Sequence, residues 1–358
     1  MKITHLECWA QDLTINEPYT IAYETVSHCT NVFLRAETDS GISGWGCAAP
    51  DAVITGETGG SVVQAYNDFI FPLLKDFDPF RYASAAEQIK KQLVKQPSAC
   101  AMADMLLYDL MARKAGEPLY KFLGGFRDFI PTSITIGILP VEETLKKAKQ
   151  FIKSGFSILK IKGGCNVEDD IRKLNLVRQE MGPQIEIRFD ANQGYNLEQA
   201  IEFIRETKDA EIELLEQPTD KMNEELLGQV TKNVDIPVMA DESLMNLKDV
   251  FRLTANNFTD MINIKLMKAG GITEAMHINS VAKAAGVESM IGCMDESALA
   301  ISAGLHFALS RPNISYADLD GHLDLQDDPF AGTVILKEGV LYPVDANGFS
   351  GKIRQKWF

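Results

Sequence analysis

Positive charge is scarce in this sequence. Its 358 residues include 35 lysines and arginines against 50 aspartates and glutamates, a formal net charge of −15. Nucleic acids and anionic membrane surfaces attract an excess of Lys and Arg, so we expect neither as a partner. No apolar run approaches the ~18 residues that a membrane span needs, and the first seven residues lack the apolar stretch of a signal peptide. The cytoplasm is the compartment we expect.

Other common signatures are also missing. The six cysteines form no C-x-x-C pair and no cluster with histidine, which predicts reduced thiols and neither a disulfide framework nor a zinc site. Neither G-x-G-x-x-G nor G-x-x-x-x-G-K-[ST] occurs. A doubly wound nucleotide-binding sheet would carry such a loop after its first strand, so its absence argues against that fold.

Two patterns divide the chain. Residues 31–37 and 41–46 alternate in polarity and predict antiparallel strands, followed by helices near 59–74, 84–95 and 98–115. From about residue 131 the pattern becomes strand–helix repeats. The predicted strands lie near 132–136, 158–162, 185–190, 212–216, 236–241, 260–265, 287–292 and 314–318, with helices such as 141–154, 166–181, 196–207 and 272–285. Eight parallel strands favour a closed barrel over an open sheet, because no strand then needs an edge.

Five charged residues, spaced 24 to 28 positions apart, each end a short apolar run: Lys162, Asp190, Glu216, Asp241 and Lys265. A buried strand that ends in an ionisable group must compensate that charge. In a parallel barrel the C-terminal strand ends meet at one mouth, where active sites lie. The common phase therefore predicts one shared site.

The three carboxylates lie on the predicted third, fourth and fifth strands. Neighbouring carboxylates repel one another unless a cation lies between them, and oxygen-only ligation suits Mg²⁺. The alternative is that each carboxylate pairs separately at the surface, but the shared phase argues against that reading.

Lysines end the second and sixth predicted strands. Lys160 and Lys162 lie two residues apart, hence on one face, and Lys265 lies half a turn of the barrel away. Opposed lysines can remove a proton from one face of a carbon and return a proton to the other face. Ion-paired scaffolding and Schiff-base chemistry remain alternatives for single lysines.

Several segments together resemble one family: Lys160-Ile-Lys162, Phe189-Asp-Ala-Asn-Gln-Gly194, Glu216-Gln-Pro218, Ala240-Asp-Glu-Ser243, Asn263-Ile-Lys-Leu-Met-Lys-Ala-Gly-Gly271 and Gly292-Cys-Met-Asp-Glu-Ser297. The chain resembles the enolase superfamily, in its muconate-lactonizing-enzyme-like branch, and within that branch the dipeptide epimerases. The resemblance implies an α/β fold, a modified TIM barrel (β/α)7β over residues 126–325. It also implies an N-terminal α+β capping domain over 1–125 and a C-terminal segment, 326–358, that returns to the capping domain.

The resemblance further implies a role for each strand-end residue. Asp190, Glu216 and Asp241 would bind one Mg²⁺ per active site, and Lys162 and Lys265 would be the acid/base pair. Lys160 would help to neutralise an enediolate. The implied reaction is 1,1-proton transfer at the α-carbon of a dipeptide's C-terminal residue, carried out by an isomerase that we expect to form a homo-oligomer.

Further positions bear on the substrate. The pair Asp318 and Asp320 would bind the free α-ammonium of a dipeptide, although an Asp-x-Asp pair alone also occurs as a solvated loop. Glu24 and Asp295 would favour a cationic residue in the dipeptide, unless they point to solvent. The other pocket candidates are Thr135, Cys293 and Met294.

Three other functions remain as alternatives. They are an L-Ala-D/L-Glu epimerase, an o-succinylbenzoate synthase or cycloisomerase using the same lysines, and a Schiff-base lyase. A binding module without catalysis is disfavoured, because the full set of ionisable residues is present.

Overall fold

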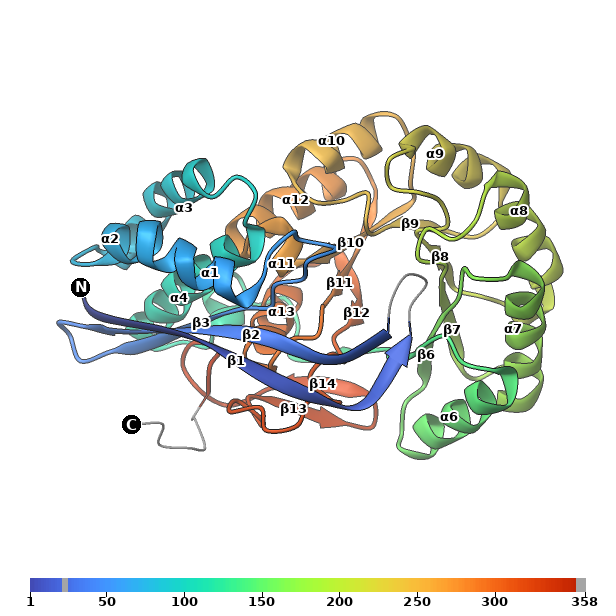
Figure 1. Ribbon diagram of the computed structural model, residues 1–358, viewed down its shortest axis with the longest axis horizontal. Coiled ribbons are helices and arrows are strands. Elements are labelled where there is room, and N and C mark those ends of the chain that lie inside the picture. The colour runs from blue at the N-terminus through green and yellow to red at the C-terminus, as the bar shows by residue number, and fades with distance from the viewer. Residues whose placement is uncertain (21–24, 352–358) are drawn as a thin grey trace.

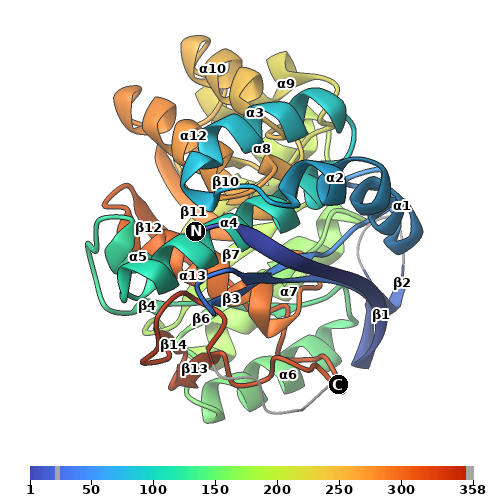
Figure 2. The same cartoon turned by 90° about the vertical axis from the view of Figure 1, so that its left-hand side faces the viewer.

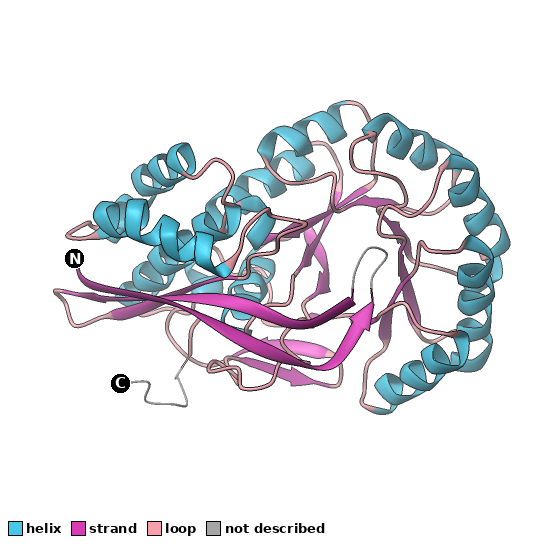
Figure 3. Ribbon diagram, viewed as in Figure 1, coloured by secondary structure: helices cyan, strands magenta, loops and turns pink. Residues whose placement is uncertain are grey.

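The computed structural model of the protein describes residues 1–20 and 25–351 and has two parts (Figure 1). An antiparallel sheet with helices lies beside a ring of parallel strands, and helices cover the outside of that ring (Figure 3). Within the described residues, no helix is both long and apolar enough to cross a bilayer.

The N-terminal part is a three-stranded meander with helices packed on it (Figure 2). The strands are β1 (Ile3–Thr20), β2 (Thr25–Thr38) and β3 (Ser43–Ala48). The helices are α1 (Gly59–Ala65), α2 (Phe71–Leu74), α3 (Tyr82–Gln92) and α4 (Pro97–Ala115). The expected continuous helix over 59–74 is interrupted, because residues 66–70 form a π-helical turn between α1 and α2.

Helix α4 is the core of this part. Every residue from Ser98 to Ala112 is buried, so its methionines serve packing, as the small and long apolar residues predict. At the β3 contact, a Cβ on Gly46 would lie 2.0 Å from the carbonyl oxygen of Met102. Only glycine lets the strand approach the helix this closely.

The barrel prediction is confirmed. Eight parallel strands are hydrogen-bonded in sequence order: β5 (Ile134–Ile136), β6 (Ile158–Lys162), β7 (Glu186–Asp190), β8 (Leu214–Glu216), β9 (Val238–Ala240), β10 (Met261–Lys265), β11 (Glu288–Gly292) and β12 (Ile314–Asp318). The helices between them are α6 (Val141–Lys153), α7 (Val167–Met181), α8 (Leu197–Glu206), α9 (Glu224–Asn233), α10 (Leu247–Ala255), α11 (Leu266–Ala269), α12 (Ile272–Ala284) and α13 (Ala298–Ser310). Between the first and last strands, Ser133 N donates to Ala317 O at 3.1 Å.

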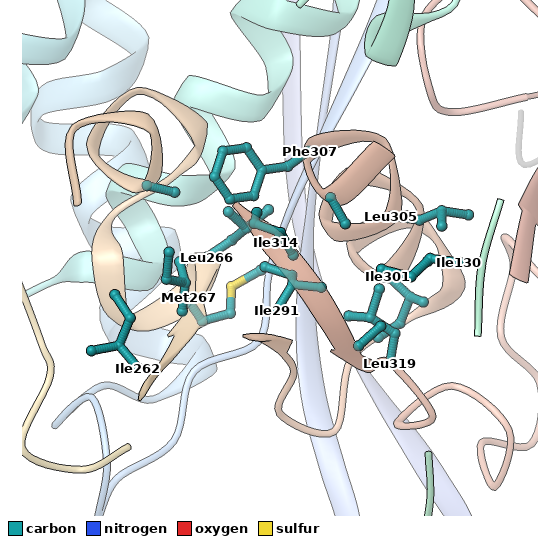
Figure 4. Packing of buried hydrophobic residues seen from close by; sticks show 14 of the residues in the cluster. Ile130, Ile262, Leu266, Met267, Ile291, Ile301, Leu305, Phe307, Ile314 and Leu319 are labelled. Atoms are coloured by element: carbon teal, nitrogen blue, oxygen red, sulfur yellow. The ribbon is translucent and has the colours of Figure 1, made fainter. Parts of the chain in front are cut away.

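Apolar side chains fill the space between strands and helices. Figure 4 shows Ile262, Ile291 and Ile314 of the barrel strands packed with Ile301 and Phe307 of α13, all within one buried cluster. Neighbouring strand residues such as Leu214 and Leu215 point to opposite faces and are both fully buried, so the strands are buried on both faces, as their continuous apolar runs predict.

The chain crosses between its two parts more than once. After α5 (Leu119–Phe122), the short strand β4 (Ile130–Pro131) pairs with β14 (Val340–Pro343), which pairs with β13 (Val334–Lys337). Phe349 N donates to Asp109 of α4 at 2.9 Å. At the barrel mouth, Asn16 N of β1 donates to Asp324 O at 2.8 Å, which docks the long β1–β2 ribbon on the loop after β12.

Candidate active site

A cavity of about 150 Å³ lies at the C-terminal ends of the barrel strands, roofed by residues from the N-terminal part such as Ile15 and Ile54. Ten of the residues that the sequence predicts line it: Thr135, Lys160, Lys162, Asp241, Lys265, Cys293, Met294, Asp295, Asp318 and Asp320. Asp190 and Glu216 are buried behind Lys160. Glu24 lies outside the described residues.

Lys160 stands at the centre of the buried charges. Its Nζ lies 2.8 Å from Glu216 Oε2, 2.9 Å from Asp318 Oδ2 and 3.2 Å from Asp190 Oδ2. Burial opposes its charge, but these three carboxylates raise the pKa of Lys160 well above its ordinary value. Lys160 is therefore a fixed positive charge at the end of β6.

Lys160 alone does not balance the negative charge of the carboxylates around it. Burial raises the pKa of Glu216 to about 8, and neighbouring Asp190 adds to the effect against the opposing field of Lys160. Asn263 of β10 donates to Glu216 Oε1 at 2.8 Å and fixes its orientation. Burial likewise raises the pKa of Glu242 to about 7, and Glu242 Oε2 has no hydrogen-bond partner. Such a cluster binds a further cation favourably.

Asp241, one residue beyond β9, is paired with two lysines. Lys265 Nζ lies 2.8 Å from Asp241 Oδ2, and Lys268 Nζ contacts Asp241 Oδ1. Against the effect of burial, Lys265 and Lys268 lower the pKa of Asp241 well below its usual range. Burial disfavours the charge of Lys265, but Asp241 raises its pKa above its ordinary value. Lys265 therefore rests as an ammonium.

The donor set fits Mg²⁺ in its chemistry. Asp190 and Glu216 end β7 and β8, Asp241 directly follows the adjacent β9, and all three offer only carboxylate oxygens, which suit a hard cation. Within residues 1–20 and 25–351, no group of three His, Cys, Asp or Glu side chains converges in ligating geometry. Instead, the carboxylates form ion pairs with lysine ammonium groups. The three carboxylate side chains would therefore have to reorient to coordinate one metal ion together. That these three residues hold the metal stays a prediction.

The two lysines of the predicted acid/base pair enter one cavity from opposite sides. Lys162 ends β6 and Lys265 ends β10, and Figure 1 shows these strands across the ring from each other. Lys162 is half-buried and lies beside Asp190 in the strand register. A substrate carbon in the cavity would lie between the side chains of Lys162 and Lys265.

Asp318 ends β12 and Asp320 follows it, and Lys160 links Asp318 to the carboxylates at the ends of β7 and β8. Asp318 accepts from Ser133 Oγ at 2.6 Å and from Lys160 Nζ at 2.9 Å. Asp320 accepts from the Thr135 backbone amide at 2.6 Å. Burial, together with Asp318, raises the pKa of Asp320 to about 7. A bound ammonium would relieve that repulsion.

The loop after β11 forms a further wall. It carries Cys293, Met294 and Asp295, and Asn31 of β2 holds it. Asn31 Nδ2 donates to the Asp295 carbonyl at 3.1 Å, and Asn31 Oδ1 accepts from Ser297 N at 2.9 Å. The N-terminal sheet therefore fixes the loop that faces the substrate space.

Sequence reasoning missed several residues of this site. Lys268, Glu242 and Asn192 line the cavity, although the segments that contain them carried the family resemblance. Gln217 Oε1 accepts from Asp241 N at 2.9 Å and from Ser243 N at 3.1 Å, which couples the ends of β8 and β9. Its position directly after Glu216 was the available signal.

Comparisons with known proteins identify the family of this chain. Residues 4–124 match the model described as "Mandelate racemase / muconate lactonizing enzyme, N-terminal domain", and residues 143–357 match "Enolase C-terminal domain-like". The L-Lys-D/L-Arg epimerase of Desulforapulum autotrophicum is 41% identical, over 98% of this chain and 99% of that protein. The dipeptide epimerase of Enterococcus faecalis, solved with Mg and L-Leu-L-Tyr, is 37% identical with a TM-score of 0.95, covering 98% of this chain and 99% of that one. That of Methylococcus capsulatus, solved with Mg and L-Arg-D-Lys, is 34% identical with a TM-score of 0.93 and the same coverage. The chain belongs to the mandelate racemase/muconate lactonizing enzyme family of the enolase superfamily.

Proposed function

We propose that this protein is a Mg²⁺-dependent dipeptide epimerase, an isomerase that inverts the α-carbon of the dipeptide's C-terminal residue. The observation that carries the proposal is that Lys162 and Lys265 enter one cavity from opposite sides of the barrel, beside a cluster of carboxylates. An α-proton beside a carboxylate is weakly acidic, so its removal needs a placed base and concentrated positive charge at the carboxylate oxygens.

The lysines divide the work. Lys265 rests as an ammonium on Asp241 and is ready to donate a proton from Nζ. Lys162 faces it from β6 and exchanges a proton with the other face of the α-carbon. Lys160 is held charged by three carboxylates, so it contributes electrostatic stabilisation and transfers no proton. Inversion in either direction then requires both Lys162 and Lys265.

Asp190, Glu216 and Asp241 would hold the Mg²⁺. When bound, the ion supplies Lewis-acid charge for the substrate carboxylate. Asp318 and Asp320 would bind the free α-ammonium at the other end of the dipeptide. The site would therefore select a substrate that carries both a carboxylate for the metal and an α-ammonium for this pair.

The charge of the cavity supports a preference for cationic dipeptides. Its lining holds four lysines and seven acidic residues: Asp51, Asp241, Glu242, Asp295, Asp318, Asp320 and Asp324. A bound Mg²⁺ would offset the charges of Asp190 and Glu216, which lie behind the lining. The lining itself then has three more acidic than basic side chains. Two of its acids, Glu242 and Asp320, are partly protonated near neutral pH, which reduces this negative charge without removing it. A zwitterionic dipeptide brings no net charge, whereas a Lys or Arg side chain complements this excess. An L-Ala-D/L-Glu substrate would increase it.

We also propose that the protein acts in the cytoplasm as a homo-oligomer. Free thiols at all six cysteines support a reducing compartment. Three aromatic side chains near α5 and β4, Phe122, Phe126 and Phe129, are 37%, 56% and 51% exposed, which supports an interface between copies. Light scattering on the purified protein would give the oligomeric state, and a monomer would contradict this part of the proposal.

A dipeptide library in ²H₂O tests the function. With Mg²⁺, mass spectrometry should show a deuteron gained at the C-terminal α-carbon of intact dipeptides, mainly those with Lys or Arg. Loss of water from a succinylbenzoate-type precursor, without exchange in any dipeptide, would favour the synthase alternative. Borohydride trapping on a lysine without metal would instead indicate a Schiff-base lyase.

A further inference from the structure

A buried carboxylate that the proposed chemistry does not use lies behind Lys162. Asp170, in the first turn of α7, is 2% exposed. Its Oδ2 accepts from the Gly164 backbone amide and from the Tyr195 hydroxyl, both at 2.8 Å. Its Oδ1 lies 3.3 Å from Nζ of Lys173, which is also buried. Burying a carboxylate is costly, so these bonds must compensate it.

The bonds of Asp170 join two segments that leave the barrel mouth. Gly164 follows Lys162 by two residues, and Tyr195 follows Asp190 by five. The segments are packed backbone to backbone, because a Cβ on Gly164 would lie 2.0 Å from the Ala191 carbonyl oxygen. Gly164 also has φ +98°, a conformation that favours glycine. Asp170 therefore fixes the chain directly after β6 against the chain after β7.

The two acid/base lysines are held in different ways. Lys265 is held by its side chain, through the 2.8 Å ion pair with Asp241. Among the described residues, no hydrogen bond or ion pair holds the Lys162 side chain. The position of Lys162 therefore depends on its backbone, which Gly163 N secures by donating to Asp190 O at 2.9 Å.

We propose that Asp170 is a positioning residue for Lys162, acting through its hydrogen bonds to Gly164 and Tyr195, and that it serves one of the two proton transfers selectively. This inference rests on the proposed function, in which Lys162 and Lys265 serve opposite faces of the α-carbon. A small displacement of a base costs rate steeply, and here the displacement should affect only the face that Lys162 serves.

Proton exchange with retention separates the faces. In ²H₂O, an epimer that exchanges its α-proton without inversion uses only one lysine, whereas inversion uses both. Lys162→Ala and Lys265→Ala, measured with Mg²⁺ on both epimers of an active dipeptide, identify which epimer each lysine serves. In Asp170→Asn, inversion and the exchange of the Lys162-served epimer should fall about 10- to 100-fold, and exchange of the other epimer less than about threefold.

Matched variants keep the test decisive. Tyr195→Phe removes one bond to Asp170 without burying a new group, and should give the same one-sided pattern with a smaller effect, even if Asp170→Asn does not fold. Asp169→Asn removes the same charge from the exposed neighbour in the same helical turn, and it should change the exchange rate of neither epimer. Amide hydrogen exchange at Gly164 should accelerate in Asp170→Asn, which reports the positioning without catalysis.

This inference would be overturned if Tyr195→Phe slowed α-proton exchange of both epimers equally, or if the Gly164 amide exchanged at an unchanged rate in a folded Asp170→Asn. Either result would leave the proposed function standing. Loss of exchange on both faces in Lys162→Ala would instead contradict the two-base function, and the inference with it.

Discussion

Replacing Lys160 with methionine tests the buried charge cluster. The change keeps an unbranched side chain of similar length and removes the ammonium that lies 2.8 to 3.2 Å from Glu216, Asp318 and Asp190. Removing one partner of a buried ion pair typically costs about 3–5 kcal/mol. Because three carboxylates lose their cation together, we expect Lys160→Met to lose at least about 3 kcal/mol of unfolding free energy in EDTA.

The loss should depend on pH with a definite sign. Burial already raises the pKa of Glu216 to about 8 against the opposing field of Lys160, so removing Lys160 should raise that pKa further. A carboxylate with a raised folded-state pKa contributes stability at low pH and loses it as pH rises. The deficit of Lys160→Met should therefore grow as pH rises above about 8, where Glu216 ionises in the parent but stays protonated in the variant. Excess Mg²⁺ should narrow it, since a divalent ion can neutralise the same carboxylates.

Urea unfolding followed by tryptophan fluorescence measures these differences. Lys146→Met, at an exposed position of α6, is the matched control and should change stability by less than about 0.5 kcal/mol. A Lys160→Met protein as stable as the parent above about pH 8 in EDTA would refute the electrostatic reasoning, because the carboxylates would then not depend on the ammonium.

Three further results are expected. The value of kcat/KM should rise with pH through about 7, because Asp320 ionises there and can then bind the substrate ammonium. Asp320→Asn should raise KM and flatten that pH profile. An unchanged pH profile in Asp320→Asn would mean that Asp320 does not bind the ammonium. Burial lowers the pKa of His306 to about 3, and its Nδ1 accepts from Tyr120 N. Between about pH 7 and about pH 5, only the unfolded state therefore takes up a proton at this histidine, and the unfolding free energy should fall by about 2 kcal/mol. Urea unfolding of His306→Gln should show that slope reduced, and an undiminished slope would assign it to other groups. Asp295→Asn should reduce the ratio of kcat/KM for Lys- or Arg-containing over neutral dipeptides about three- to tenfold, the value of one partly exposed ion pair; an unaltered ratio would mean that Asp295 does not contact the substrate.

Periodicity sufficed for the barrel because its strands are short apolar runs, several of which end in a charged residue. The strands ending in Lys162, Asp190 and Lys265 begin and end within one residue of their predicted ranges. The long strand β1 was not predicted, because polar residues such as Gln11 and Asp12 interrupt its apolar positions, and its pairing with β2 supplies what its own pattern lacks. The π-helical turn at Tyr66–Ile70 likewise has no local signature.

For the site, the sequence indicates which residues share the mouth but not which charges pair. Strand number places Lys160 beside the carboxylates, yet its bridging of Glu216 and Asp318 depends on β8 and β12 closing on β6. The pairing of Lys268 with Asp241 depends on how the short helix α11 turns after β10. Such contacts follow from packing across the barrel, which one sequence without its fold does not specify.

The most direct test of the central claim, that two opposed lysines invert one carbon, is the stereochemical outcome of the reaction with a single active dipeptide in ²H₂O. With Mg²⁺, the inverted epimer should carry solvent deuterium at the C-terminal α-carbon. Lys265→Ala should abolish inversion while calorimetry still detects Mg²⁺ binding. Full turnover in Lys265→Ala, or an inverted product that retains its original proton in full, would contradict the two-lysine account.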